Sequence, residues 1–159
     1  MEIRPARAGE FDVMWGMFKQ AIATQDALPF AGSFAVETFR THWFQAEAPH
    51  VAVLEGRVVG MYKMGPNFPD LGAHVASATY VVDAPAQGQG VGRALVEHSL
   101  ERARAEGFLA MQFNYVVSTN RPAVALYRKL GFDVVGTLPK AFRHGTLGLV
   151  DVFVMHRFL

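Results

Sequence analysis

The sequence predicts an α+β fold in which helices flank a mixed sheet of about seven strands. Short apolar segments of strand-like character occur at the start, in the middle and at the end of the chain, and segments with helical apolar spacing separate them. In addition, 51% of the 159 residues are hydrophobic and 18% are charged, which is the composition of a folded globule. Because a chain of this length buries one core, residues 1–159 are expected to form a single domain.

The first part of the chain is predicted to contain one strand and two helices. Residues 1–6 have the character of a short strand. In the helix that follows, apolar residues recur at helical spacing, namely Phe11, Met14, Trp15, Phe18 and Ile22. Pro29 and Gly32 end this helix, and Ser33 is expected to cap a second one that stops before Pro49.

A hairpin and a stiff loop are predicted next. β-branched and apolar residues in 50–54 and 58–64 flank a short turn that contains Gly56, which is typical of two antiparallel strands. Residues 65–72 include two prolines and are predicted to form a loop, because proline cannot donate a hydrogen bond within a central strand. The chain then returns as a strand over residues 74–82.

The C-terminal half is predicted to alternate between helices and strands. Gly107 and Gly131 are the residues at which its two helices stop, and Pro122 occupies the first turn of the second helix. The predicted elements are a helix over 91–106, a strand over 110–117, a helix over 120–130, and strands near 133–136 and 149–157.

Charge and residue usage exclude several classes of function. Fifteen Lys and Arg residues against fourteen Asp and Glu residues give a net charge of +1 without a basic run, so nucleic acid is not an expected partner. The apolar runs are too short to span a bilayer and the N-terminus lacks a signal region, so neither a membrane partner nor export is expected. Because cysteine is absent and the six histidines lack metal-ligand spacing, we predict a cytoplasmic protein that binds no metal.

Three glycines lie between the strand over 74–82 and the next helix. Gly88, Gly90 and Gly92 lack Cβ atoms, so the backbone can turn sharply and its N–H groups can converge at the positive end of the helix dipole. An anion such as a phosphate is the expected guest, and a tight turn without a ligand is the alternative. A Walker loop is excluded because Arg93 follows the last glycine, and a dinucleotide site is excluded by the glycine spacing and the missing carboxylate.

The segment Gln87-Gly88-Gln89-Gly90-Val91-Gly92 resembles the acetyl-CoA loop of the GNAT superfamily of N-acetyltransferases, whose signature is Gln/Arg-x-x-Gly-x-Gly/Ala. Residues 120–132 are similar to the other sequence block of that family. The resemblance implies a mostly antiparallel sheet split by a V-shaped cleft. It also implies acetyl-CoA as the cosubstrate and an acceptor site covered by the N-terminal helices.

The resemblance assigns roles to individual residues. It implies that the strand end pairs with the pantetheine amides, that the loop amides hold the pyrophosphate, and that Asn120 binds the pantetheine arm. Tyr127 lies where family members direct a hydroxyl at the CoA sulfur, so it is the expected acid, and an aromatic residue packed on the sheet is the alternative. The implied acetyl-CoA-binding residues are Tyr80, Val81, Val82, Gln87, Gly88, Gln89, Gly90, Val91, Gly92, Arg93, Asn120 and Tyr127.

Residues 61–69, 74–77 and 112–120 look like a narrower branch, which contains the fungal N-acetyltransferases that detoxify proline analogues. In that branch, asparagines at the positions of Ser77 and Asn114 contact the acceptor or assist at the reacting carbonyl. Asn114 matches and is the second expected catalytic residue. Ser77 is shorter and departs from the pattern, so the proline-analogue substrate is not carried over. The implied substrate-binding residues are Ser77, Asn114, Asn67 and Phe68.

The general base is left unassigned. Residues 76–82 contain no carboxylate, and His74 and Asp83, near the two ends of that strand, are either bases acting through water or solvated residues. A loop is also predicted between the last two strands. Its basic residues are expected to meet a CoA phosphate, an acceptor carboxylate or only solvent; they are Lys140, Arg143 and His144.

The favoured hypothesis is an N-acetyltransferase that moves the acetyl group of acetyl-CoA to the amine of a small molecule, an amino acid or a toxic analogue, by direct attack. The absence of cysteine excludes a cysteine acetyl-enzyme intermediate. A non-catalytic acyl-CoA-binding regulatory module and a protein N-acetyltransferase are the alternatives. The apolar residues 150–155 permit a homodimer.

Overall fold

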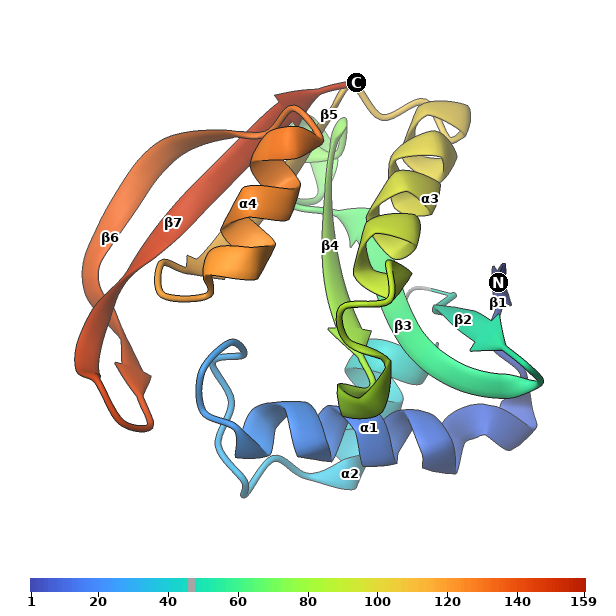
Figure 1. The fold of residues 1–159 in the computed structure, drawn as a ribbon. Helices are drawn as coiled ribbons and strands as arrows, with labels where there is room; N and C mark the ends of the chain where they lie inside the picture. Colours follow the sequence, from blue (N-terminus) through green and yellow to red (C-terminus); the bar gives the residue numbers. More distant parts are fainter. Residues whose placement is uncertain (46–47) are drawn as a thin grey trace.

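Over residues 1–45 and 48–159, which the computed structural model describes, seven strands form one sheet with helices on both faces (Figure 1). The strand order is β1-β2-β3-β4-β5-β7-β6. The strands are β1 (Glu2–Pro5), β2 (His50–Leu54), β3 (Arg57–Pro66), β4 (Val75–Val82), β5 (Ala110–Val117), β6 (Asp133–His144) and β7 (Gly148–Phe158). The helices are α1 (Phe11–Ala23), α2 (Val36–Phe39), α3 (Val91–Ala105) and α4 (Arg121–Lys129). These elements confirm the predicted α+β fold.

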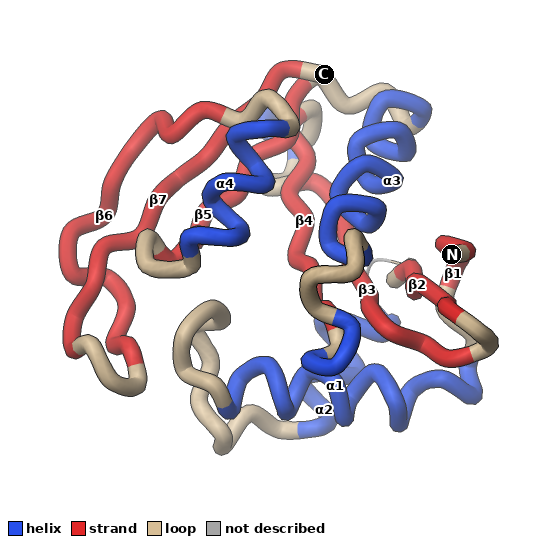
Figure 2. Tube along the Cα trace, viewed as in Figure 1, coloured by secondary structure: helices blue, strands red, loops and turns tan. Residues whose placement is uncertain are grey.

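The sheet is split between β4 and β5. Neighbouring strands pair antiparallel throughout the sheet except at this point, where β4 and β5 run parallel. Their pairing consists of two steps, Val75 with Ala110 and Ala76 with Met111, after which the strands diverge (Figure 2). The rest of β4 and β5 therefore forms the two walls of a V-shaped cleft, which confirms the predicted split in the sheet.

The two faces of the sheet pack on different helices because successive strand residues point to opposite sides. Tyr62 of β3 and Tyr80 of β4 belong to the core under α3 and α4. Their chain neighbours Met61 and Val81 belong to a second core, which α1 and α2 cover with aromatic side chains. The sheet is thus a partition between two sides of the cleft, one facing α3 and α4 and the other facing away from them.

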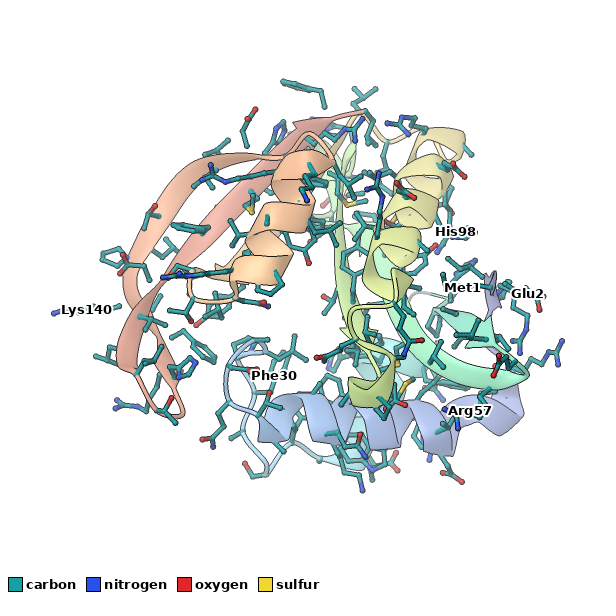
Figure 3. All side chains as sticks on the ribbon, in the orientation of Figure 1. Met1, Glu2, Phe30, Arg57, His98 and Lys140 are labelled. Carbon is teal, nitrogen blue, oxygen red and sulfur yellow. The ribbon has the colours of Figure 1, made fainter. Side chains whose placement is uncertain are left out.

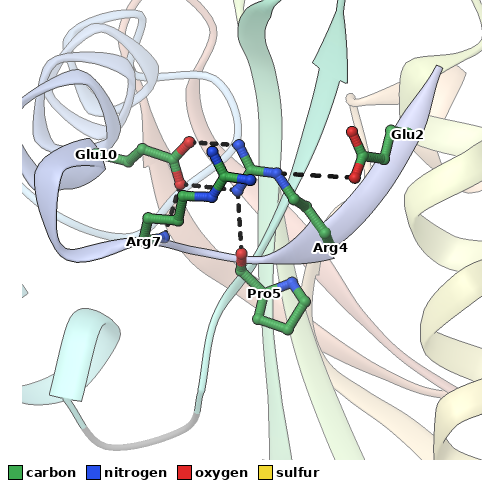
Figure 4. Close-up of polar contacts among 5 residues, drawn as sticks. All are labelled: Glu2, Arg4, Pro5, Arg7 and Glu10. Atoms are coloured by element: carbon green, nitrogen blue, oxygen red, sulfur yellow. Dashed lines mark hydrogen bonds and ion pairs between the residues drawn. The ribbon is translucent and has the colours of Figure 1, made fainter.

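An ion pair joins β1 to the start of α1 (Figure 4). The Arg4 guanidinium donates two hydrogen bonds to the Glu10 carboxylate, at 2.7 and 3.1 Å, and the Arg7 backbone N–H donates a third at 2.7 Å. The hydrogen bonds from Arg4 are the main cause of a lowered pKa at Glu10, so this carboxylate stays charged. The contact fixes the angle at which the chain leaves the sheet and enters α1.

The segment after α1 differs from the prediction. α2 begins after Ala35, which is extended, and not after Ser33. The helix covers Val36–Phe39 and continues as a π-helical turn over Arg40–Gln45. This turn stacks the buried rings of Phe39 and Trp43 with their centroids 5.8 Å apart. Aromatic packing against α1 sets this conformation, and local helix propensity does not.

β3 extends into the segment that was predicted to be a loop. Gly65 and Pro66 pair with Ser77 and Ala76 of β4. Pro66 is tolerated because β2, the neighbour of β3 on the other side, pairs with β3 only as far as Tyr62. No described strand on that side therefore needs a hydrogen-bond donor at Pro66. This pairing places Gly65 directly beside Ser77 in the site.

The last two strands, β6 and β7, are longer than predicted and form an extended hairpin, which we call the arm. β6 continues to His144, so Lys140, Arg143 and His144 lie in a strand and not in a loop. This part of β6 escaped prediction because most of its residues are exposed and show no apolar alternation. Lys140 projects from the arm at a bulge, where its φ is +51° (Figure 3).

β7 lies inside the sheet, between β5 and β6. Val152 and Met155 are buried, so packing within the chain accounts for much of the apolar character of residues 150–155. The homodimer expected from that segment stays a prediction.

A partly buried polar cluster connects the β2–β3 hairpin to the outer side of α3. The Tyr62 hydroxyl lies 2.8 Å from His98 Nδ1, and the Arg102 guanidinium lies 3.2 Å from His50 Nδ1. Burial lowers the pKa of both histidines, and the nearby Arg102 charge lowers the pKa of His50 further. Figure 3 shows His98 on the outer side of α3. Folding therefore favours the neutral form of both imidazoles.

The cluster predicts that the protein loses stability in acid. Because the folded-state pKa of His50 and His98 lies below the ordinary value of 6.5, the unfolded chain binds protons first as the pH falls. We expect the free energy of unfolding in urea to be highest above pH 7 and to fall as the pH drops below about 6.5. The substitution His50→Gln should flatten this dependence, whereas His156→Gln, outside the cluster, should leave it unchanged. An equal slope in all three proteins would contradict the assignment.

The contact between β3 and α3 predicts a destabilising substitution. A Cβ added at Gly60 would lie 2.9 Å from Val91 Cγ1 and 3.0 Å from Leu95 Cδ1, both of which are buried. We expect Gly60→Ala to lower the free energy of unfolding by roughly 1 to 3 kcal/mol through overpacking. Gly16→Ala is the matched control, because its Cβ meets nothing within 4 Å in the middle of α1, and it should raise stability by about 0.5 to 1 kcal/mol. Thermal or urea denaturation would measure both changes.

Candidate functional site

A cavity of about 1030 Å³ occupies the cleft on the α3 and α4 side of the sheet. The end of β4, the glycine-rich turn, the start of α3 and one face of α4 line it, and the C-terminal part of α1 with the following loop closes it from below. All three residues of the strand end that were predicted to bind pantetheine, Tyr80, Val81 and Val82, line this space. The cavity is large enough for an extended ligand rather than a single small ion.

The glycine-rich turn adopts the conformation that its composition favours. Gly88 has φ +77° and Gly90 has φ +81°, which are strained for any residue with a Cβ. α3 starts directly after Gly90, and no side chain of residues 1–45 and 48–159 caps it. The first backbone N–H groups of the helix therefore point toward the cavity at the positive end of the dipole, where an anion is stabilised.

The remaining residues of the turn play different parts. A Cβ at Gly92 would meet Val82 and Leu126 at ordinary van der Waals distances of 3.7 and 3.9 Å, so the packing of the chain itself does not require a glycine there. The remaining reason for a glycine at position 92 is that a ligand can then approach the backbone closely. The Gln89 side chain donates to the Pro85 carbonyl at 3.1 Å and tethers the turn. The exposed Arg93 is paired with Glu97 at 2.8 Å, one helical turn along.

The opposite wall of the cavity comes from the segment after β5 and from α4. Asn120 lines the cavity just before α4, as does its neighbour Thr119. The Thr119 hydroxyl is buried and, among the described residues, has no hydrogen-bond partner. A buried hydroxyl without a partner costs free energy, so a ligand in the cavity would be stabilised by bonding to it. Thr119 was missed in the sequence because a single threonine at a strand end carries no signal.

Tyr127 faces the cavity from α4 within a group of aromatic rings. Its ring lies 4.6 Å from that of Phe113 and 5.9 Å from that of Phe132, centroid to centroid. Burial raises the pKa of Tyr127 to about 12, so the hydroxyl stays protonated at neutral pH. The geometry is therefore compatible with both interpretations of Tyr127 from the sequence, the acid and the packed aromatic residue, because the ring packs on the sheet and the residue lines the cleft.

The Tyr80 side chain is committed to the core. Its hydroxyl lies 2.7 Å from the Ser99 Oγ, and Ser99 in turn donates to the Val96 carbonyl at 2.7 Å. Burial raises the pKa of Tyr80 well above its usual value. The side chain has its hydrogen-bond partner within α3, so the backbone of Tyr80 is the part that is available to a ligand.

A smaller hollow of about 180 Å³ lies on the other face of the sheet, between β3 and β4. Asn67 and Ser77 line it, and Asn114 of β5 reaches Asn67 across the cleft. The Asn114 Nδ2 donates to the Asn67 Oδ1 at 2.6 Å, and Gln112 donates to the Asn114 Oδ1 at 2.8 Å. The structure thus brings three of the four predicted substrate-binding residues together. Phe68 is 65% exposed and lies outside the hollow.

Neither candidate base from the sequence lies in the cleft. Asp83 follows β4, but it does not line either cavity, and its backbone N–H donates to the Val59 carbonyl. His74 lies at the closed end of the V, where its carbonyl accepts from the Leu109 N–H. The carboxylate that does line the larger cavity, among the described residues, belongs to Asp26 in the loop after α1. This loop carries no motif, so the sequence did not indicate it.

The arm reaches the same loop. His144 lines the larger cavity, whereas Lys140 and Arg143 do not. The Gly145 N–H donates to the Gln25 carbonyl at 2.9 Å, so the tip of the arm is joined to the loop after α1. Within the described ranges, no group of three His, Asp or Glu side chains is placed to hold a metal ion. The helices found there are also too short or too polar to cross a membrane.

Comparison with known proteins places this geometry in a family. Residues 20–132 match the model of the acetyltransferase (GNAT) family. A mycothiol acetyltransferase from Saccharomonospora viridis is 42% identical over 107 residues, which cover 64% of this chain and 35% of that protein. The chain therefore spans about a third of the length of that curated relative.

Two solved structures share the fold. A GCN5-related N-acetyltransferase from Kribbella flavida superposes with a TM-score of 0.96 at 40% identity, over 99% of this chain and 97% of that one. A GNAT superfamily phosphinothricin acetyltransferase from Sinorhizobium meliloti, in complex with acetyl-CoA, gives a TM-score of 0.87 at 21% identity, over 99% and 88% of the two chains. Because the family model covers most of the chain and the Kribbella structure matches nearly all of it, this protein belongs to the GNAT acetyltransferase family.

Proposed function

We propose that this protein is an acetyl-CoA-dependent N-acetyltransferase that acts on the amine of a small molecule, an amino acid or an analogue of one, and that residues 1–159 act as one domain. The observation that carries the proposal is the split between β4 and β5, which connects the glycine-rich turn on one face of the sheet to a polar hollow on the other. A thioester ligand bound from one face would present its acetyl group to an amine that enters from the other.

The larger cavity supports acetyl-CoA as the substrate. The diverging part of β4 offers the backbone of Tyr80, Val81 and Val82 to the pantetheine amides, as an added strand would use it. The backbone amides from Gln87 to Arg93, including Val91, would hold the pyrophosphate. Asn120 and the unpartnered Thr119 hydroxyl would bond the pantetheine arm.

The chemistry follows from the groups on the two faces. The nitrogen lone pair of the amine attacks the thioester carbonyl carbon, the carbon–sulfur bond breaks, and the proton lost by nitrogen ends on the CoA sulfur. Asn114 has a second N–H on its amide, beyond the one bound to Asn67, with which to polarise the carbonyl or orient the amine. Because the pKa of Tyr127 is about 12 and that of a thiol is about 8.5, Tyr127 serves the departing thiolate as a hydrogen-bond donor more readily than as a full proton donor.

Acetyl-CoA binding and thiol release test this function separately. We expect acetyl-CoA at millimolar concentration to raise the melting temperature and to protect the amides of residues 87–93 from hydrogen exchange. A panel of small amines with a thiol-reactive dye should then reveal CoA release that depends on the amine. Protection without thiol release from any amine would favour the non-catalytic acyl-CoA-binding module, and the absence of both effects would reject acetyl-CoA as the ligand.

The role of Tyr127 predicts a split between turnover and binding. Tyr127→Phe should lower kcat by roughly 10- to 100-fold, because one hydrogen bond to a developing charge is lost, and should leave the acetyl-CoA Kd within about threefold of its original value. In the original protein, kcat should not fall up to about pH 10, because burial keeps Tyr127 protonated there. Tyr62→Phe, which removes a hydroxyl outside the cleft, is the control and should leave kcat unchanged. An unaltered kcat in the Tyr127 variant would remove it from the mechanism.

A further inference from the structure

The hollow between β3 and β4 has a shape that follows from the register of these strands. Lys63 lies opposite Thr79, and Gly65 lies opposite Ser77. These positions share the face that is turned away from α3 and α4, because the intervening Met64 and Ala78 pack in the core beneath those helices. Gly65 has no side chain to fill the space beside Ser77, so a depression remains there.

The lining of this hollow is rich in hydrogen-bond donors. Its described polar side chains are the ammonium of Lys63, the hydroxyls of Ser77 and Thr79, and the amide of Asn67. Lys63 is the charged residue among them, so the charge that the described lining brings to the hollow is positive. The rest of the described lining consists of small or apolar residues and offers no competing negative charge.

Contacts with the segment after α2 hold the Lys63 head in place. The Nζ atom donates to the His42 carbonyl at 3.1 Å and lies 5.7 Å from the centroid of the Trp43 ring. The Trp43 ring is buried, and the lysine is half-buried beside it. One hydrogen bond to a carbonyl uses one of the three ammonium protons, so further donors are available to a ligand.

The hollow is adjacent to the place where the amine would react. Asn67 belongs to the hollow and also accepts a hydrogen bond from Asn114, which stands on the other wall of the cleft. A molecule whose anionic group occupies the hollow beside Lys63 would therefore hold an amine, attached a few atoms away, at the edge of the cleft near Asn114. An amino acid carries an amine and a carboxylate on one small molecule and therefore suits this arrangement.

We infer that Lys63, with Ser77 and Thr79, binds the carboxylate of the acceptor, so the acceptor is an amino acid and not a simple amine. The inference rests on the proposed acetyltransferase function and adds the charge of the substrate to it. A hollow of about 180 Å³ with one cation suits a planar carboxylate, whose two oxygens accept from the ammonium and from the hydroxyls. Lys63 acts here as a residue for specificity and binding, since it lies on the acceptor side and not at the thioester.

Matched acceptors would test the inference. The proteinogenic amino acids and their carboxamides, which differ in one negative charge, would be compared at saturating acetyl-CoA by thiol release. We expect kcat/KM to favour the acid over its amide by at least about tenfold, through KM. Lys63→Met should bring this ratio close to one and Thr79→Val should lower it, whereas Lys63→Arg should retain part of it. Lys19→Met, on the exposed side of α1, is the control and should keep the original ratio.

The outcomes separate this inference from the function on which it rests. Turnover of acids and amides with equal kcat/KM, or an unchanged ratio in a Lys63→Met protein that melts normally, would overturn the carboxylate site and leave the acetyltransferase intact. If Lys63→Met does not fold, Thr79→Val supplies the same comparison, and an unchanged ratio there would overturn the site as well. Thiol release from no amine at all would reject the proposed function and this inference together.

Discussion

The parallel pairing of β4 with β5 at only two steps is the constraint on which the site depends. Backbone N–H and C=O groups that no longer pair within the sheet must be satisfied by another partner, and along the free part of β4 an extended ligand can supply it. The same divergence opens a passage through the sheet. It therefore gives one ligand a strand to bind along and gives a second ligand access to it from the opposite face.

The two faces of the sheet differ in chemistry because the strand residues alternate. The side under α3 and α4 contains aromatic rings, including Tyr127, whose pKa burial raises to about 12, and Phe113 beside it. Where the other side borders the cleft, beyond the aromatic core under α1 and α2, it presents amides and hydroxyls, with Asn114 and Asn67 hydrogen-bonded to each other. The protonated Tyr127 hydroxyl and these polar groups therefore lie on opposite faces of one sheet.

The parts of the site that could be predicted are those formed by short segments. The turn at Gly88 and Gly90 and the start of α3 depend on glycine conformations within a few residues, so the sequence predicts them well. The parts that were missed or wrong depend on distant partners. Asp26 lines the cavity only because its loop folds toward the tip of the arm, where Gly145 donates to the Gln25 carbonyl. His144 does so only because β6 continues as an arm. The sequence leaves the general base open, and Asp83, one of its two candidates, follows β4 directly in the chain but lies outside both cavities.

The sequence by itself determined the order of helices and strands, the α+β class, the glycine-rich turn before α3 and the exclusion of a cysteine intermediate, since each rests on local conformation or composition. Only the tertiary structure decided where β4 diverges from β5 and which residues meet across that gap. It also decided that Lys63 lies opposite Thr79, next to the pair formed by Gly65 and Ser77. All of these features depend on contacts between residues that are far apart in the chain. Their geometry follows from strand register and from packing of the two cores, and neither is encoded in any one segment.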